Sequence, residues 1–117
     1  MLTLSELPIV AVRGHIEEDI RALSEAFSDE QEFVSALHAI SAELRLIVGD
    51  PDRGGSLHGH YTAWKYSKFQ SQRSQHHPAD LRIIFRRVAE AGASHVEVRA
   101  FGHRWHPVAV YLRGKDR

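Results

Sequence analysis

The chain contains no cysteine, one methionine and four prolines among its 117 residues. Without cysteine, a disulfide scaffold, a cysteine-ligated zinc ion and a thiol nucleophile are all excluded. No apolar run approaches the roughly 18 residues that a membrane span needs. Residues 1–6 lack the basic and apolar regions of a secretory signal. The sequence therefore predicts a cytoplasmic chain with no membrane partner.

The remaining composition is that of an ordinary globular protein. Hydrophobic residues make up 43% and charged residues 26% of the chain, which predicts a packed core. The length suits one unit, and no internal repeat or long linker divides it. We therefore expect a single domain over residues 1–117.

A formal net charge of zero hides an uneven distribution of charge along the chain. Residues 1–50 hold ten acids and three bases, a net charge of −7. Residues 51–117 hold twelve bases and five acids, a net charge of +7, together with seven of the nine histidines. A basic half of this kind favours a local site for a polyanion. The alternative is that the two halves neutralise each other in the folded molecule.

The first half predicts a short strand followed by two helices. Residues 8–12 form a short apolar run, which favours a strand. Residues 17–19 are acidic, and we expect them in the first turn of the first helix, where carboxylates suit the helix dipole. Residues 28–31 have the form of a capping box for the second helix, which should end at residues 49–51. The apolar stripes at helical spacing are Ile16, Ile20, Leu23 and Phe27, then Phe33, Leu37, Ile40, Leu44 and Ile47.

The second half predicts a sheet that the helices cover. We expect strands at residues 57–69, 81–88 and 96–101, loops at 52–56 and 70–80, a turn at 90–94, and either an edge strand or one helical turn at 108–111. The whole is an α+β fold: a short N-terminal strand and a two-helix hairpin packed on a mainly antiparallel sheet of about four strands. One sheet face meets the helices, and the other is available for basic residues.

Most standard catalytic motifs are missing, and the histidines need separate treatment. The chain has no Walker loop, no GxSxG and no HExxH. Imidazoles at His58, His60, His103 and His106 would suit a zinc or nickel site, but their spacing matches no compact ligand pattern. We therefore expect no metal and no cofactor. His76 and the neighbouring His77 are interpreted as solvated loop residues.

Cations on the predicted C-terminal strands carry the strongest chemical signal. Neighbouring strands lie about 5 Å apart, so side chains distant in sequence can converge on one sheet face. A cluster of cations can bind a phosphodiester and stabilise the charge that grows when a ribose 2′-hydroxyl attacks phosphorus, while a phenol or imidazole moves protons. For each residue alone, the alternative is an ordinary surface cation or a half-buried aromatic. The set is Lys65, Lys68, Arg82, Arg104 and Tyr111, with His103 close by.

The pattern of these residues from position 57 to 111 resembles the RelE/ParE toxin superfamily of bacterial toxin–antitoxin modules. The matching pieces are Leu57-His-Gly59, Trp64-Lys-Tyr-Ser-Lys-Phe69, Leu81-Arg-Ile-Ile-Phe85, the stretch from Val96 to Gly-His-Arg104, and Tyr111. The order of elements before them also agrees with a RelE-like fold.

The resemblance implies a toxin that is a ribosome-dependent endonuclease of messenger RNA, or a relative of one, and that a cognate antitoxin holds inactive. Lys65, Lys68 and Arg86 would bind RNA phosphates, and Arg82 would contact the scissile phosphate. The expected proton-transfer and transition-state residues are Arg104, Tyr111 and His103. Tyr111 would act as a general base or stack on a base of the RNA.

Two other readings stay open at this point. A gyrase-directed branch of the same superfamily keeps the fold without the catalytic set, so a toxin-like protein could act by binding, as could a decayed copy. An unrelated α+β module that binds a metal or a protein is the second alternative. The sequence also leaves self-association open.

Overall fold

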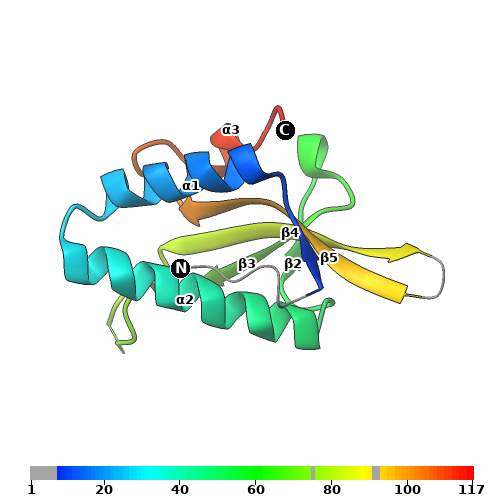
Figure 1. Ribbon diagram of the computed structural model, residues 1–117, viewed down its shortest axis with the longest axis horizontal. Coiled ribbons are helices and arrows are strands. Elements are labelled where there is room, and N and C mark those ends of the chain that lie inside the picture. The colour runs from blue at the N-terminus through cyan, green and yellow to red at the C-terminus, as the bar shows by residue number, and fades with distance from the viewer. Residues whose placement is uncertain (1–7, 75, 91–92) are drawn as a thin grey trace.

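The computed structural model describes residues 8–74, 76–90 and 93–117, and Figure 1 shows helices packed on a sheet in this part of the chain. In chain order its elements are β1 (Ile9–Val10), α1 (Arg13–Ala26), α2 (Glu30–Gly49), β2 (Gly55–Ser56), the 3₁₀ turn η2 (Gly59–Tyr61), β3 (Lys65–Phe69), β4 (Leu81–Glu90), β5 (Ala93–His103) and α3 (Val110–Arg113). The α+β class, the short first strand and the helix hairpin are confirmed. No helix in the described ranges is long and apolar enough to cross a membrane.

The sheet has five strands in these ranges, in the order β1-β5-β4-β3-β2, rather than about four. It is mixed, because β1 runs parallel to β5 while the other neighbours are antiparallel. The additional strand is β2, which was expected to be a loop and pairs with the start of β3. Its approach requires glycine: Gly54 has φ +90°, and a Cβ there would lie 2.2 Å from the Tyr66 carbonyl oxygen.

Both helices begin at different residues from those expected. α1 starts at Arg13, so the acidic residues 17–19 are not in its first turn, which holds no acid. The predicted capping box at residues 28–31 is wrong by one position. Asp29 is the N-cap of α2, and its side chain accepts a hydrogen bond from the Glu32 N–H at 3.1 Å, which satisfies a donor that the helix leaves free.

The predicted strand at residues 57–69 is correct only in its last part. η2 interrupts it, because Gly59 and Ala63 have φ values of +65° and +73°, which an extended strand does not allow. β4 and β5 are longer than expected and form the predicted hairpin. Residues 91 and 92 of the predicted turn lie outside the described residues. Of the two expectations for residues 108–111, the helical turn is confirmed as α3.

The two faces of the sheet carry separate apolar clusters. The face under α1 and α2, which we call the helix face, contains Leu81, Ile83 and Phe85 of β4, and the apolar stripes of both helices pack there. The opposite face, which we call the second face, contains Ile84, packed with residues from η2 and α3. The second face is therefore partly covered, whereas the sequence predicted it to be free for basic residues. The second cluster consists of Tyr61, Trp64, Ile84, Ala100 and Val110, with Leu57 and Tyr111 at its margin.

A bulge in β5 keeps both clusters in place. Ile84 pairs with Ala100 but Phe85 pairs with Val98, so Arg99 is an extra residue on β5. Its guanidinium carbon lies 4.7 Å from the Tyr61 ring centroid on the second face.

Candidate functional site

Strand register brings two of the predicted cations into one row on the second face. Lys68 of β3 pairs with Arg82 of β4, which pairs with Gly102 of β5. The next row contains Tyr66, which pairs with Ile84. Because side chains alternate along a strand, Tyr66, Lys68 and Arg82 all lie on this face. Tyr66 was not singled out from the sequence, although its position two residues before Lys68 is the signal that would have found it.

Arg82 lies in the middle of this row, beside the phenol of Tyr111. Its Nη1 donates to the carbonyl oxygens of Ala79 at 2.6 Å and Leu81 at 2.9 Å. These two bonds fix the guanidinium at the start of β4 and leave three of its five N–H donors for other partners. Tyr111 comes from α3, where its own carbonyl accepts a hydrogen bond from the Tyr61 hydroxyl at 2.5 Å.

The pKa of Tyr111 decides which proton role this residue can take. Burial raises the pKa, the charge of Arg82 and a hydrogen bond from it oppose the rise, and the net shift is upward. A phenol with a raised pKa is protonated at neutral pH. Tyr111 is therefore better suited to donate a proton or a hydrogen bond than to act as a general base.

Arg104 lies just beyond the end of β5, next to the same stretch of chain that holds Arg82. Its backbone N–H donates to the Asp80 carbonyl at 2.8 Å, which extends the β4–β5 ladder by one pair. This hydrogen bond places the backbone of Arg104 at the end of the strands that carry Arg82. The guanidinium carbon stacks 3.9 Å from the ring centroid of Trp105, which sequence analysis had not singled out.

His103 does not join this group. It pairs with Leu81 of the helix-face core, and its ring centroid lies 5.8 Å from that of Phe27. Its Nδ1 accepts backbone hydrogen bonds from Trp105 at 3.0 Å and His106 at 3.1 Å. Burial lowers its pKa, with a smaller opposing effect from Asp80. The imidazole thus lies on the helix face, where its hydrogen bonds fix the loop that follows β5.

Two further predicted phosphate binders also lie apart from Arg82. Lys65 pairs with Phe85 and so belongs to the helix face, opposite to Lys68. Arg86 is on the second face, but its Nη2 lies 3.2 Å from a carboxylate oxygen of Glu97 and its guanidinium stacks on Trp64 at 4.4 Å. The structure thus brings Lys68, Arg82 and Tyr111 together, and it places the backbone of Arg104 at the same end of the strands.

A serine, a histidine and an aspartate meet in the loop between β3 and β4. His77 Nε2 lies 3.1 Å from both the Ser71 hydroxyl and an Asp80 carboxylate oxygen. Ser71 also donates to Asp80 from its hydroxyl and its backbone N–H. A catalytic triad uses different imidazole nitrogens for the two partners, so this cluster only fixes the loop. His77 is half-buried, which contradicts its reading as a solvated residue; His76 is exposed.

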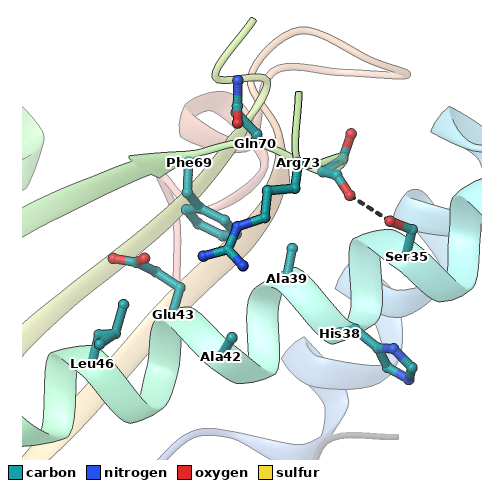
Figure 2. Close-up of a pocket in the computed structure, with 10 residues that line it drawn as sticks. Ser35, His38, Ala39, Ala42, Glu43, Leu46, Phe69, Gln70 and Arg73 are labelled. Atoms are coloured by element: carbon teal, nitrogen blue, oxygen red, sulfur yellow. Dashed lines mark hydrogen bonds between the residues drawn. The ribbon is translucent and has the colours of Figure 1, made fainter. Parts of the chain in front are cut away.

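A separate groove of about 420 Å³ lies between α2 and the end of β3. Figure 2 shows Ser35, Ala39 and Leu46 along its helical side, with Phe69 and Arg73 across from them. The Ser35 hydroxyl donates to the Ser71 carbonyl at 2.7 Å. Glu43, the buried carboxylate in this groove, is already bonded by Arg53 and Ser67. The groove contains none of the predicted site residues.

Metal chemistry gains no support from the side-chain geometry. Across residues 8–74, 76–90 and 93–117, no three histidine, cysteine, aspartate or glutamate side chains are grouped so that they could hold an ion.

Comparison with known proteins does not place the chain in a family. No protein-family model, no curated protein and no solved structure matches it significantly.

Proposed function

We propose that this protein is a cytoplasmic RelE-like toxin that binds messenger RNA on the second sheet face. It cleaves the RNA at the phosphate that Arg82 binds. The observation that carries the proposal is the Arg82 guanidinium beside the protonated Tyr111, with Lys68 in the same row. Two carboxylates of neighbouring segments already have partners: Asp80, just before β4, contacts His77, and Glu97 of β5 contacts Arg86. A phosphodiester would thus meet uncompensated positive charge.

The chemistry follows from the residues that meet there. Arg82 and Lys68 bind the scissile phosphate, and Arg104 stabilises the additional charge on its oxygens. The ribose 2′-oxygen forms a bond to phosphorus and releases its proton to water, while the bond from phosphorus to the 5′-oxygen breaks. Tyr111 gives its proton to the departing 5′-oxygen. The products are a 2′,3′-cyclic phosphate and a free 5′-hydroxyl, and no metal takes part. A cognate antitoxin would restrain this activity.

A second candidate, a toxin-like protein that binds without cleaving, is favoured by one specific feature. His103 lies on the helix face, and the pKa of Tyr111 is raised. Among the described residues, the second face therefore offers no established general base beside Arg82. Binding to gyrase or to RNA would need only the cations.

Inducible expression in bacteria, with transcript integrity and growth as readouts, separates these candidates. The wild type should fragment transcripts, and Arg82→Ala should stop both fragmentation and growth arrest. Arg87→Ala is the matched control, because Arg87 lies on the same strand but on the helix face and is exposed. Growth arrest with intact transcripts would support binding alone. Equal fragmentation by the Arg82→Ala variant would overturn the proposed site.

A further inference from the structure

Trp105 is exposed beside the proposed site, unlike the other tryptophan of the chain. Its exposed fraction is 60%, whereas Trp64 is 8% exposed. Burial of apolar surface is the main driving force of folding, so an aromatic ring this large in solvent is a candidate contact surface. The guanidinium of Arg104 lies over the ring at 3.9 Å.

The loop that presents Trp105 is held at several points. The backbone N–H groups of Trp105 and His106 both donate to His103 Nδ1, and the N–H of Arg104 donates to the Asp80 carbonyl. Because the lowered pKa of His103 keeps its imidazole neutral at pH 7, Nδ1 stays available as an acceptor. The exposure of the indole is therefore a property of a fixed loop.

The loop is also tied to the residues that position Arg82. Arg82 donates to the carbonyls of Ala79 and Leu81, and Arg104 donates to the carbonyl of the residue between them. The Arg82 side chain and the Arg104 backbone thus both bond to carbonyls of residues 79–81. Trp105, the residue after Arg104, is therefore presented at the same end of β4 and β5 as Arg82.

We propose that Trp105, backed by Arg104, is a stacking platform for a base of the RNA next to the scissile phosphate. This inference rests on the proposed function and names the part of the substrate that the site recognises. Bases stack on aromatic side chains whatever their sequence, and an adjacent arginine adds cation–π and phosphate contacts. The platform would raise affinity without strong sequence preference.

Charge favours RNA over a protein partner on this part of the loop. Farther along the same segment, Val108 and Leu112 are also exposed and border a groove of about 330 Å³ next to α1. The charged residues that line that groove are two acids and two bases, so it offers no net positive charge to a phosphate chain: Glu18, Glu25, Arg21 and Arg113. Trp105 instead has the cation Arg104 over its ring. Of these exposed apolar side chains, Trp105 is therefore the one that best suits a nucleic acid.

The two tryptophans make the test direct. In a Trp64→Phe variant, Trp105 is the sole indole, and titration with a short 2′-O-methyl oligoadenylate should quench its fluorescence. This probe lacks the attacking hydroxyl and is not cleaved. In the matched Trp105→Phe variant, emission from the buried Trp64 should hardly change. Trp105→Ala should weaken binding about ten- to hundred-fold, and Trp105→Phe much less. If Trp64→Phe does not fold, the difference between wild type and Trp105→Phe gives the same signal.

The outcomes separate this inference from the proposed function. RNA binding in a mobility-shift assay without quenching of Trp105, or with full affinity in Trp105→Ala, would overturn the platform and leave the function standing. No binding by the wild type at low salt would overturn both. Shielding of Trp105 from acrylamide that rises with protein concentration, without RNA, would identify a self-association surface and also overturn the platform.

Discussion

Single residues in this sheet act together or apart according to the face on which they lie. Lys65 and Lys68 are three residues apart on β3 and lie on opposite faces of the sheet. Arg82 and Arg87 of β4 also lie on opposite faces. The sequence predicts the strands and their cations, but the face of each side chain depends on register. The helix-face core sets that register when Leu81, Ile83 and Phe85 pack under the helices. This is why the cations of the strands could be predicted from the sequence, while the position of His103 on the opposite face could not.

His103 makes a pH-dependent contribution to stability. Its folded pKa lies below the value near 6.5 of the unfolded chain, chiefly because of burial. As pH falls below about 6.5, the unfolded state gains a proton that the native state resists, so the free energy of unfolding should decrease. Urea midpoints at pH 7.5 and 5.5 would measure this slope.

His103→Asn isolates the contribution of the imidazole. Its side-chain oxygen can still accept the backbone N–H groups of Trp105 and His106, but it does not titrate. Of the other groups acting on the ring, Asp80 favours its protonation, while His106, Arg104 and Arg82 oppose it. We expect a shallower pH slope than in the wild type. His60→Asn, at an exposed position, should retain the wild-type slope, and an unchanged slope in His103→Asn would contradict the assignment.

At the scale of elements, the C-terminal segment covers the part of β5 that β1 leaves unpaired. β1 pairs only with Val96 and Glu97. Beyond them, Arg113 donates to the Phe101 carbonyl and Arg117 to the Arg99 carbonyl. The buried carboxylate of Asp19 on α1 accepts from both arginines and from the Phe101 N–H. Side chains thus satisfy a strand edge that would otherwise invite pairing with another chain.

Asp19→Ala should therefore destabilise the fold strongly. The side chains of Arg113 and Arg117 are 9% and 6% exposed. Without Asp19, Arg113 loses its carboxylate partner and Arg117 keeps only that of Glu18. We expect a loss of about 3–5 kcal/mol in the free energy of unfolding, measured by urea denaturation. Glu18→Ala is the control, because Glu18 is 52% exposed where it meets Arg117, and it should cost less than about 1 kcal/mol. Equal effects of the two substitutions would contradict this account.

The elements differ in how well sequence predicts them. α2 has a long apolar stripe and a capping aspartate, and both signals are local. β2 has two residues, Gly55 and Ser56, and exists only because β3 pairs with them. The acidic residue Asp19 reads as a solvated helix position, yet Arg113 and Arg117 bury it from 94 and 98 residues away in sequence. Such long-range partners leave no local pattern.

At the scale of the whole molecule, the acidic and basic halves do neutralise each other in part. Arg53 pairs with Glu43, and Arg113 and Arg117 pair with Asp19. Within the described residues, no carboxylate forms a salt bridge with Lys68, Arg82 or Arg104. The charge division along the chain therefore resolves into structural ion pairs and a smaller set of cations that have no carboxylate partner in this part of the chain.

This distribution predicts how salt affects RNA binding. Affinity for the 2′-O-methyl oligoadenylate should fall as salt rises, because bound phosphates release counterions. Lys68→Ala should make the slope of log affinity against log salt shallower by about 0.7, the value for one contact to a single strand. Lys65→Ala removes the same charge from the helix face and should leave the slope unchanged. Fluorescence anisotropy over a salt series measures both, and equal changes would mean that binding is not confined to the second face.

The extra residue at Arg99 also determines which changes in length β5 can absorb. Val98 and Phe101 both lie in the helix-face core although they are three positions apart. The alternation of side chains along β5 is therefore shifted by one residue at the bulge. Deleting Arg99 would restore regular alternation along β5 and leave Val96, Val98 and Phe101 on the helix face. Deleting Glu97 instead would place Val96 out of phase, with its side chain toward the second face. β5 therefore tolerates the loss of one residue at this bulge without turning a core side chain outward, and the residue without a pairing partner there is a cation.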